Sequence, residues 1–273
     1  HANRAIDVRI LSAAEIRERE PNASPDVRGG LLVPSESLVD PFMASIAYAE
    51  IALANGVDIL LGADIAGVEL GQPPGAPLHH LITADGHRLP ARRIVNAAGL
   101  GGRRLAAGYG GGAFDINPRR GQFLLFDKSA RPLVQHILLP VPTAHTKGVL
   151  VAPTIFGNLL AGPTAEDLPL NDPAATHTTV EGIRRVLEGG SRLVDGLARQ
   201  PVIATYAGAR CACSQGSYVI RHNDGAPGIV TITGVRSTGL TASISLARHL
   251  IDGMQKELGL ELSPDSAALD SRP

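Results

Sequence analysis

The sequence predicts an α/β (α+β) fold that joins a nucleotide-binding type of layer to an antiparallel sheet. Residues 229–233 are all β-branched and predict a buried strand. Gly234 and Gly239 bracket a turn after that strand, and apolar residues then recur at helical spacing from Thr241 onward. The middle of the chain instead holds short apolar runs separated by Pro, Gly and Asp. This pattern is typical of an antiparallel sheet, and the runs are residues 122–126, 133–139, 148–151 and 158–161.

The composition is that of a globular protein without a strongly charged partner. The chain has 273 residues, of which 44% are hydrophobic, so it can bury a substantial core. The 25 basic and 26 acidic residues give a net charge of −1, which indicates neither a nucleic-acid partner nor membrane association. Cys211 and Cys213 are too few for a disulfide framework or a structural zinc site, and they favour a cytoplasmic location. His79, His80 and His87 match no metal template, so no metal site is predicted.

The first part of the chain predicts helices alternating with strands. Ser12 and Glu15 have the spacing of a capping box and predict a short helix that runs to about Glu20. Asp40-Pro41 predicts the start of a second helix, which Asn55-Gly56 ends. Strands are expected at residues 57–61, 65–70 and 92–95, with a hairpin over residues 78–84 and 88–89.

After the antiparallel region, a helix is expected over residues 180–193. Thr178 and Glu181 stand at capping-box spacing at its start. Strands are then expected around residues 202–206 and 217–220.

Two segments carry the signals of a ligand site. Asn96-Ala97-Ala98-Gly99 follows a predicted strand, and its small residues let a planar ligand approach the backbone closely. The alternative interpretation of residues 96–99 is a tight turn that packs against another element and binds no ligand. Residues 234–241 lead from a strand into a helix, where free N–H groups favour an anion by typically 0.3–1 kcal/mol. The alternative there is an ordinary corner that needs glycine for its backbone geometry.

A glycine-rich phosphate loop is absent from the sequence. Residues 108–113 formally match G-x-G-x-x-A, but no strand precedes them and Pro118 follows where a helix should run. This segment is expected to be a loop.

Several motifs together resemble those of FAD-dependent oxidoreductases of the D-amino acid oxidase and glycerol-3-phosphate dehydrogenase superfamily. They are most similar to the branch with the glycerol-3-phosphate dehydrogenases and L-2-hydroxyglutarate oxidases. Besides the two segments above, the motifs are residues 40–42, residues 119–127 (RRGQFLLFD), residues 153–158 with 162–167, and residues 206–210 (YAGAR). Each motif is weak alone, but their order and spacing match the family over nearly the whole chain.

The resemblance implies a partial FAD-binding Rossmann-like domain with an inserted antiparallel-sheet substrate domain. Residues 1–112 and 200–262 would be parts of the FAD-binding domain interleaved with substrate-domain segments. Residues 113–199 would be mainly substrate domain, and residues 263–273 a tail. The implied flavin contacts are Ile65, Ala97, Ala98, Gly99, Gly234, Val235, Arg236, Gly239, Leu240 and Thr241.

The implied reaction is hydride transfer from a small anionic hydroxy acid or polyol phosphate to FAD. An arginine can clamp a carboxylate or phosphate through two parallel hydrogen bonds, and the candidates are Arg210 and Arg120. The sequence identifies no catalytic base. Within the same class, an amino acid or sarcosine-type amine oxidase is an alternative.

The family begins with a βαβ unit carrying G-x-G-x-x-G, and this sequence has no such unit. The chain is therefore expected to be a fragment that needs a missing N-terminal segment, or a partner chain, to bind FAD. A non-catalytic remnant or subunit is the alternative from a different functional class.

Overall fold

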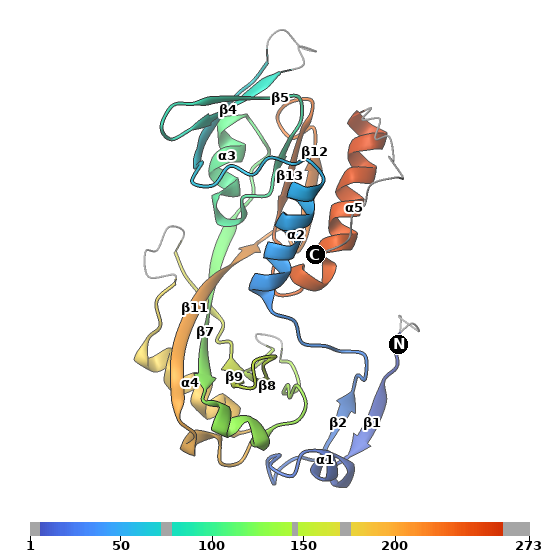
Figure 1. The fold of residues 1–273 in the computed structure, drawn as a ribbon, viewed down its shortest axis with the longest axis vertical. Coiled ribbons are helices and arrows are strands. Elements are labelled where there is room, and N and C mark those ends of the chain that lie inside the picture. The colour runs from blue at the N-terminus through green and yellow to red at the C-terminus, as the bar shows by residue number, and fades with distance from the viewer. Residues whose placement is uncertain (1–5, 72–77, 144–146, 170–175, 259–273) are drawn as a thin grey trace. The chain divides into compact units, whose positions relative to one another are not determined.

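The computed structural model describes residues 6–71, 78–143, 147–169 and 176–258 (Figure 1). The expected tail over residues 263–273 lies outside these ranges. The chain divides into two compact units. The first unit comprises His1–Asp40 and Arg119–Ala209, and the second comprises Pro41–Pro118 and Arg210–Pro273.

The first unit opens with a short hairpin and helix. Its elements are β1 (Arg9–Ser12), α1 (Ala13–Arg19) and β2 (Gly29–Leu32), and the two strands pair antiparallel. The predicted capping box is confirmed, because the Ser12 hydroxyl accepts from the Glu15 N–H and the Glu15 carboxylate accepts from the Ser12 N–H. These bonds satisfy two of the donors that a helix start leaves unpaired.

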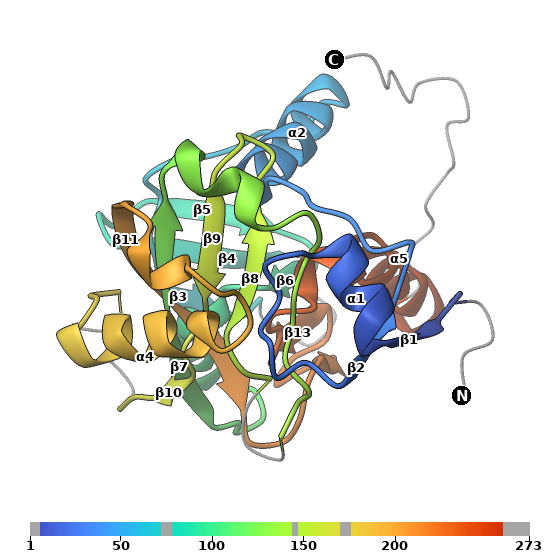
Figure 2. The ribbon, with the colours of Figure 1, turned by 90° about the horizontal axis from the view of Figure 1, so that it is seen from below.

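A five-stranded antiparallel sheet forms the body of the first unit (Figure 2). Its order is β10 (Glu166–Asp167), β7 (Ile116–Phe126), β9 (Leu159–Gly162) and β8 (Leu150–Pro153), and β11 (Val202–Cys213) also pairs with β7. Both β7 and β11 continue into the second unit. The helix α4 (Val180–Ser191) packs against β8 and β9, and its Val186 joins a fully buried core with Leu124, Phe126 and Leu159.

Two details of this unit differ from the expectation. The N-cap of α4 is Thr179 rather than Thr178, because the Thr179 hydroxyl accepts from the Gly182 N–H at 3.0 Å. Residues 133–139 form no strand: a 3₁₀ helix, Lys128–Leu133, occupies their start, and one bridge pairs Leu138 with Val151. The backbone amides in between donate to a side chain instead of a strand: the Glu20 carboxylate accepts hydrogen bonds from the N–H groups of Gln135 and His136.

The second unit contains two three-stranded sheets. The antiparallel sheet has the order β3 (Ile65–Glu69), β4 (His79–Thr83) and β5 (Arg88–Ala91), which confirms the predicted hairpin. The other sheet has the order β12 (Val219–His222), β13 (Ile229–Thr233) and β6 (Ile94–Asn96), in which β13 and β6 run parallel. The helices are α2 (Pro41–Ala54), α3 (Gly102–Gly108) and α5 (Gly239–Leu258).

The mixed α/β (α+β) fold class is thus confirmed. A second predicted strand, besides residues 133–139, is wrong: residues 57–61 are not part of any sheet in the described chain. Leu60 and Leu61 are 62% and 91% exposed, and a strand forms only where a neighbouring strand accepts and donates its backbone hydrogen bonds.

Candidate functional site

The two segments predicted to bind a ligand lie at one edge of one sheet. In the parallel register of β6 and β13, Asn96 stands opposite Thr231. The turn over residues 97–99 leaves the carboxyl end of β6, and the loop over residues 234–238 leaves the carboxyl end of β13. In open α/β sheets ligands bind outside the carboxyl ends of parallel strands, so this edge is the candidate site.

The buried side chain of Asn96 holds the turn over residues 97–99 in place. Its side chain is 3% exposed and donates to the Gly102 carbonyl at 2.9 Å and to the Tyr109 hydroxyl at 2.8 Å. Its Oδ1 accepts from the Ala98 N–H at 3.3 Å. The Tyr109 hydroxyl also lies 2.5 Å from Thr231 Oγ1, so one buried network links both strands. Tyr109 and Thr231 were not among the predicted site residues, since nothing in their local sequence shows that they meet.

The turn itself is accessible to solvent. Ala97 and Ala98 are exposed, and Gly99 has φ +56°, a conformation that glycine adopts without strain. Apart from Gly99 and its chain neighbours, no atom lies within 4 Å of the position that a Cβ at Gly99 would take. A flat ligand can therefore approach this backbone closely.

The second loop needs glycine at both ends. Gly234 has φ +73°, and a Cβ there would lie 2.8 Å from the Gly216 carbonyl oxygen. At Gly239 a Cβ would lie 2.5 Å from Cγ1 of Val235. Two side-chain hydrogen bonds secure the loop between these ends, Arg236 to Ser217 and Tyr218 to Thr238.

The loop leads into the amino end of α5, which begins at Gly239, two residues before the expected Thr241. The Thr238 carbonyl accepts from the Ala242 N–H at 3.0 Å. The N–H groups of Leu240 and Thr241 have no acceptor among the described residues. Open amides at the positive end of a 20-residue helix attract negative charge.

Arg210, a predicted substrate contact, lies on β11 and is half-buried. The next residue, Cys211, has its Sγ 3.5 Å from Thr233 Oγ1, at the end of β13. The end of β11 is therefore next to the candidate site. Successive side chains in a strand point to opposite faces, so Arg210 leaves β11 on the face opposite that of Cys211.

Arg120, the second predicted substrate contact, lies in the first unit and is 4% exposed. It stands opposite Glu166 in the register of β7 and β10, and its guanidinium bonds to that carboxylate at 2.9 and 3.2 Å. It also donates to the His177 carbonyl at 3.2 Å. This arginine already has an anionic partner within the chain, so we leave it out of the candidate site.

Ile65, a predicted flavin contact, begins β3 in the other sheet of the second unit. Its carbonyl accepts from the Arg104 guanidinium of α3 at 2.9 Å. This bond ties β3 to the helix that follows the turn over residues 97–99.

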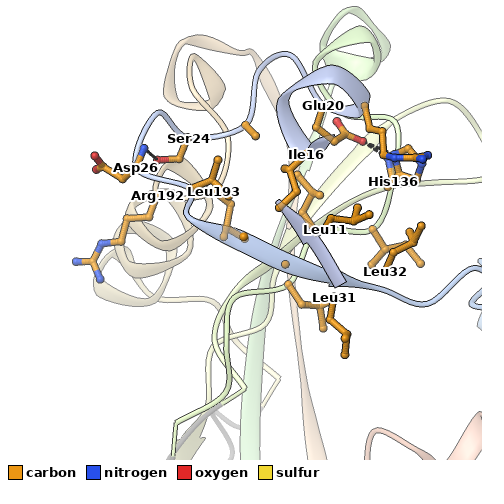
Figure 3. Close-up of a pocket in the computed structure, with 18 residues that line it drawn as sticks. Leu11, Ile16, Glu20, Ser24, Asp26, Leu31, Leu32, His136, Arg192 and Leu193 are labelled. Carbon is orange, nitrogen blue, oxygen red and sulfur yellow. Dashed lines mark hydrogen bonds and ion pairs between the residues drawn. The ribbon is translucent and has the colours of Figure 1, made fainter. Parts of the chain in front are cut away.

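A separate cavity of about 300 Å³ lies within the first unit (Figure 3). Its lining includes the apolar residues Leu11, Ile16, Leu31 and Leu32. In Figure 3 the buried Glu20 carboxylate points toward His136, and its Oε1 lies 2.6 Å from His136 Nδ1. None of the predicted site residues lines this cavity.

Within the described ranges, no group of three or more His, Cys, Asp or Glu side chains is placed to hold a metal ion. No helix among the described residues is long and apolar enough to cross a membrane.

Known proteins resemble this chain over most of its length. It is 32% identical over 250 residues to glycerol 3-phosphate dehydrogenase of Caloramator mitchellensis, in a match that covers 92% of this chain and 51% of that enzyme. It is 28% identical over 259 residues to hydrogen cyanide synthase subunit HcnC of Pseudomonas protegens, with 94% of this chain and 58% of that protein covered.

A solved structure shows the same fold. Dithionite-reduced L-alpha-glycerophosphate oxidase from Mycoplasma pneumoniae, with FAD bound, superposes with a TM-score of 0.85 at 27% identity. The match covers 98% of this chain and 68% of that one, so this chain spans only part of the length of its relatives. The family model "DAO: FAD dependent oxidoreductase" matches residues 1–252, and the chain therefore belongs to the DAO family of FAD-dependent oxidoreductases.

Proposed function

We propose that this chain is part of an enzyme that oxidises a small anionic hydroxy acid or polyol phosphate by hydride transfer to FAD. One observation carries the proposal: the turn over residues 97–99 and the amino end of α5 lie at the same edge of the sheet formed by β6 and β13. The 32% identity to a glycerol 3-phosphate dehydrogenase makes glycerol 3-phosphate the first substrate to test.

The residues present fit one side of a flavin. The exposed Ala97 and Ala98 and the half-buried Gly99 would lie against the planar cofactor. The open amides of Leu240 and Thr241 would stabilise negative charge on it. When bound, FAD supplies the hydride acceptor. Val235 and Arg236 would contribute through the loop that sets the start of α5.

Arg210 would hold the anionic end of the substrate. Its fork of N–H donors suits a phosphate or carboxylate, and a fixed anion orients the C–H bond that is broken. The proton of the oxidised hydroxyl needs a base, and we assign that role to no residue of this chain.

The remaining FAD contacts would come from polypeptide outside this sequence. The chain covers 51% of the Caloramator enzyme and lacks a G-x-G-x-x-G loop. A separate partner chain is the alternative source. The match to HcnC favours that alternative, because HcnC is named as a subunit.

Absorbance spectra test the proposal. We would purify the 273-residue chain and the full product of its gene, and record both from the near-UV to the visible. Flavin bands in the full product, bleached on addition of glycerol 3-phosphate but not glycerol, are expected. Absence of flavin bands from both proteins would contradict the enzyme proposal and favour a non-catalytic subunit.

Arg210 variants then test the substrate assignment in the flavin-containing product. A lost charge-assisted bond is worth about 1.5–3 kcal/mol, so Arg210→Ala is expected to raise KM roughly 10- to 150-fold. Arg210→Lys keeps the charge and should recover part of that loss. An unchanged KM in Arg210→Ala would remove Arg210 from the substrate site.

A further inference from the structure

The glycine-rich segment over residues 108–113 has no role in the proposed function. Gly108 ends α3, and the residues that follow form a loop that leads to β7. In phosphate-binding loops a segment of this composition holds an anion on its backbone N–H groups. In this chain an anion also meets the loop, but it is a side chain of the same unit, the Asp224 carboxylate.

Asp224 reaches the loop from the turn between β12 and β13. Its Oδ1 accepts from the Gly112 N–H at 2.7 Å, and the residue is 6% exposed. Its own N–H donates to the Ile229 carbonyl at 3.0 Å, which fixes it within the turn. Asp224 Oδ2 is buried too, and it has no hydrogen-bond partner among the described residues. A buried carboxylate costs free energy unless donors surround it, so the bond from Gly112 is one on which the turn depends.

The loop is shaped around Asp224 and Tyr109. A Cβ at Gly111 would lie 2.8 Å from Asp224 Oδ2 and 2.7 Å from Tyr109 Cε2, so only a residue without a side chain leaves room for both groups. A Cβ at Gly225, the residue after Asp224, would lie 2.5 Å from the Tyr109 carbonyl oxygen. The turn that carries Asp224 therefore packs directly against Tyr109.

Arg221 ties the same loop to β12. Its guanidinium donates to the Ala113 carbonyl at 3.0 Å, and its Cζ lies 5.6 Å from the centre of the Phe114 ring. Arg221 Nη1 and Asp224 Oδ1 both lie next to the position that a Cβ at Gly112 would take. A positive charge near the carboxylate offsets part of the cost of burying it.

Tyr109 links this loop to the candidate site. Its hydroxyl bonds to Asn96 Nδ2 and to Thr231 Oγ1, which lie on β6 and β13. The turn over residues 97–99 and the loop over residues 234–238 leave the carboxyl ends of these two strands. We call them the two ligand-facing segments.

We infer that Asp224 is a positioning residue for the two ligand-facing segments, and that it acts through Tyr109. Asp224 precedes β13, whereas the ligand-facing loop leaves the other end of that strand, so Asp224 acts by holding Tyr109 rather than by touching the cofactor. The glycine-rich loop is thus occupied by an internal carboxylate. The inference rests on the proposed function, because that function places the flavin at these segments.

Fluorescence titration of the full gene product with FAD tests the inference. Asp224→Ala removes the acceptor for the Gly112 N–H and should raise the Kd for FAD roughly tenfold. Asp224→Asn keeps an acceptor oxygen and should stay within about threefold of the wild type. Asp85→Ala is the control, since Asp85 is an exposed carboxylate in the turn between β4 and β5 of the same unit, and it should leave the Kd unchanged. Equal Kd values for Asp224→Ala and Asp85→Ala would overturn the inference.

A double variant shows whether Asp224 acts through Tyr109. In that case Asp224→Ala/Tyr109→Phe should weaken FAD binding no more than the larger of the two single changes. Two residues that act independently would instead give fold-changes that multiply, and this outcome would contradict the inference.

NMR spectra of the apo product with labelled tyrosines follow the contact without flavin. The ring signal of Tyr109, identified as the one lost in Tyr109→Phe, should move in Asp224→Ala and not in Asp85→Ala. Gly111→Ala keeps the carboxylate but crowds it against Tyr109, so it should move the same signal and raise the Kd, and it decides the matter if Asp224→Ala does not fold. An unmoved signal in the folded variants refutes the contact. A folded wild-type product that binds no FAD overturns the proposed function itself, and the positioning role with it.

Discussion

Asn96 and Thr231 stand opposite each other at the ends of two parallel strands, and the Tyr109 hydroxyl bonds to both side chains. The distances are 2.8 Å to Asn96 Nδ2 and 2.5 Å to Thr231 Oγ1. All three side chains are at most 3% exposed. This network holds the turn after β6 in register with β13, and thereby sets the spacing of the two ligand-facing segments.

Tyr109→Phe tests that network. The substitution removes one hydroxyl and leaves a buried amide and a buried hydroxyl without their partner. The cost is expected to be about 1–3 kcal/mol in the free energy of unfolding. Urea unfolding of the 273-residue chain measures it. Tyr48→Phe is the matched control, since Tyr48 is 46% exposed on α2, and it should change stability by less than about 0.5 kcal/mol. Equal effects of the two variants would show that the network contributes nothing.

Gly239→Ala tests the close packing at the start of α5. The added methyl would lie 2.5 Å from Val235 Cγ1, so the loop must shift. We expect this shift to lower the free energy of unfolding by about 1–3 kcal/mol. In the full gene product the shift should also weaken FAD binding, because it moves the open amides of Leu240 and Thr241. Fluorescence titration with FAD measures the affinity.

Rescue separates packing from other effects at Gly239. Val235→Ala removes the atom that the new methyl would meet, so the double variant Gly239→Ala/Val235→Ala should regain most of the lost affinity. Gly67→Ala in β3 is the control, since no atom lies within 4 Å of the position that a Cβ would take there. Failure of the double variant to recover would refute the packing argument.

Arg120→Met tests whether this arginine has a structural role. The change leaves the His177 carbonyl without its Arg120 donor and the Glu166 carboxylate with Gln122 Nε2, at 3.5 Å, as its remaining donor. It is expected to destabilise the chain by about 2 kcal/mol. Arg120→Met/Glu166→Leu should recover part of the loss, since it removes both charges. Denaturant unfolding gives the three values. A stable Arg120→Met protein whose full-length form has a raised KM would instead support the original prediction of a substrate contact.

The sequence patterns were most informative where the determining contacts are local. The capping box at Ser12 and Glu15, the hairpin of β4 and β5, and the strand–turn–helix from Ile229 depend on neighbouring residues, and the structure contains all three. The resemblance to flavin enzymes selected both ligand-facing segments. Their common sheet edge depends on a register between residues 94–96 and 229–231, which neither segment encodes alone.

The two wrong strand predictions have a common cause, which lies in contacts that are distant in the sequence. Residues 133–139 have a strand pattern, but Glu20, more than a hundred positions away, takes the amides of Gln135 and His136. Residues 57–61 also have a strand pattern, and they lack a neighbouring strand within the described chain. In both cases the tertiary structure decides which hydrogen-bond partners the backbone finds, and this outweighs the local strand pattern.

The Arg119–Asp167 ion pair gives the first unit a pH dependence at acid pH. The two residues face each other across β7 and β10, and the guanidinium contacts both carboxylate oxygens, at 2.6 and 2.8 Å. These hydrogen bonds from Arg119 hold the pKa of the Asp167 carboxyl below its usual range. A carboxyl with a lowered folded-state pKa contributes stability above its unfolded value of about 4, and that contribution is lost as the pH falls through the folded value.

The contribution should be under about 1 kcal/mol, because the Asp167 side chain is 61% exposed. We therefore expect the free energy of unfolding to fall with decreasing pH below about 4, and Asp167→Asn to flatten that slope. Arg119→Gln removes the same bonds from the other side and should flatten it equally, with no further change in the double variant. Urea unfolding at several pH values measures the slopes. Additive effects of the two single variants would contradict the assignment, because two residues that act only through each other cannot lose the same interaction twice.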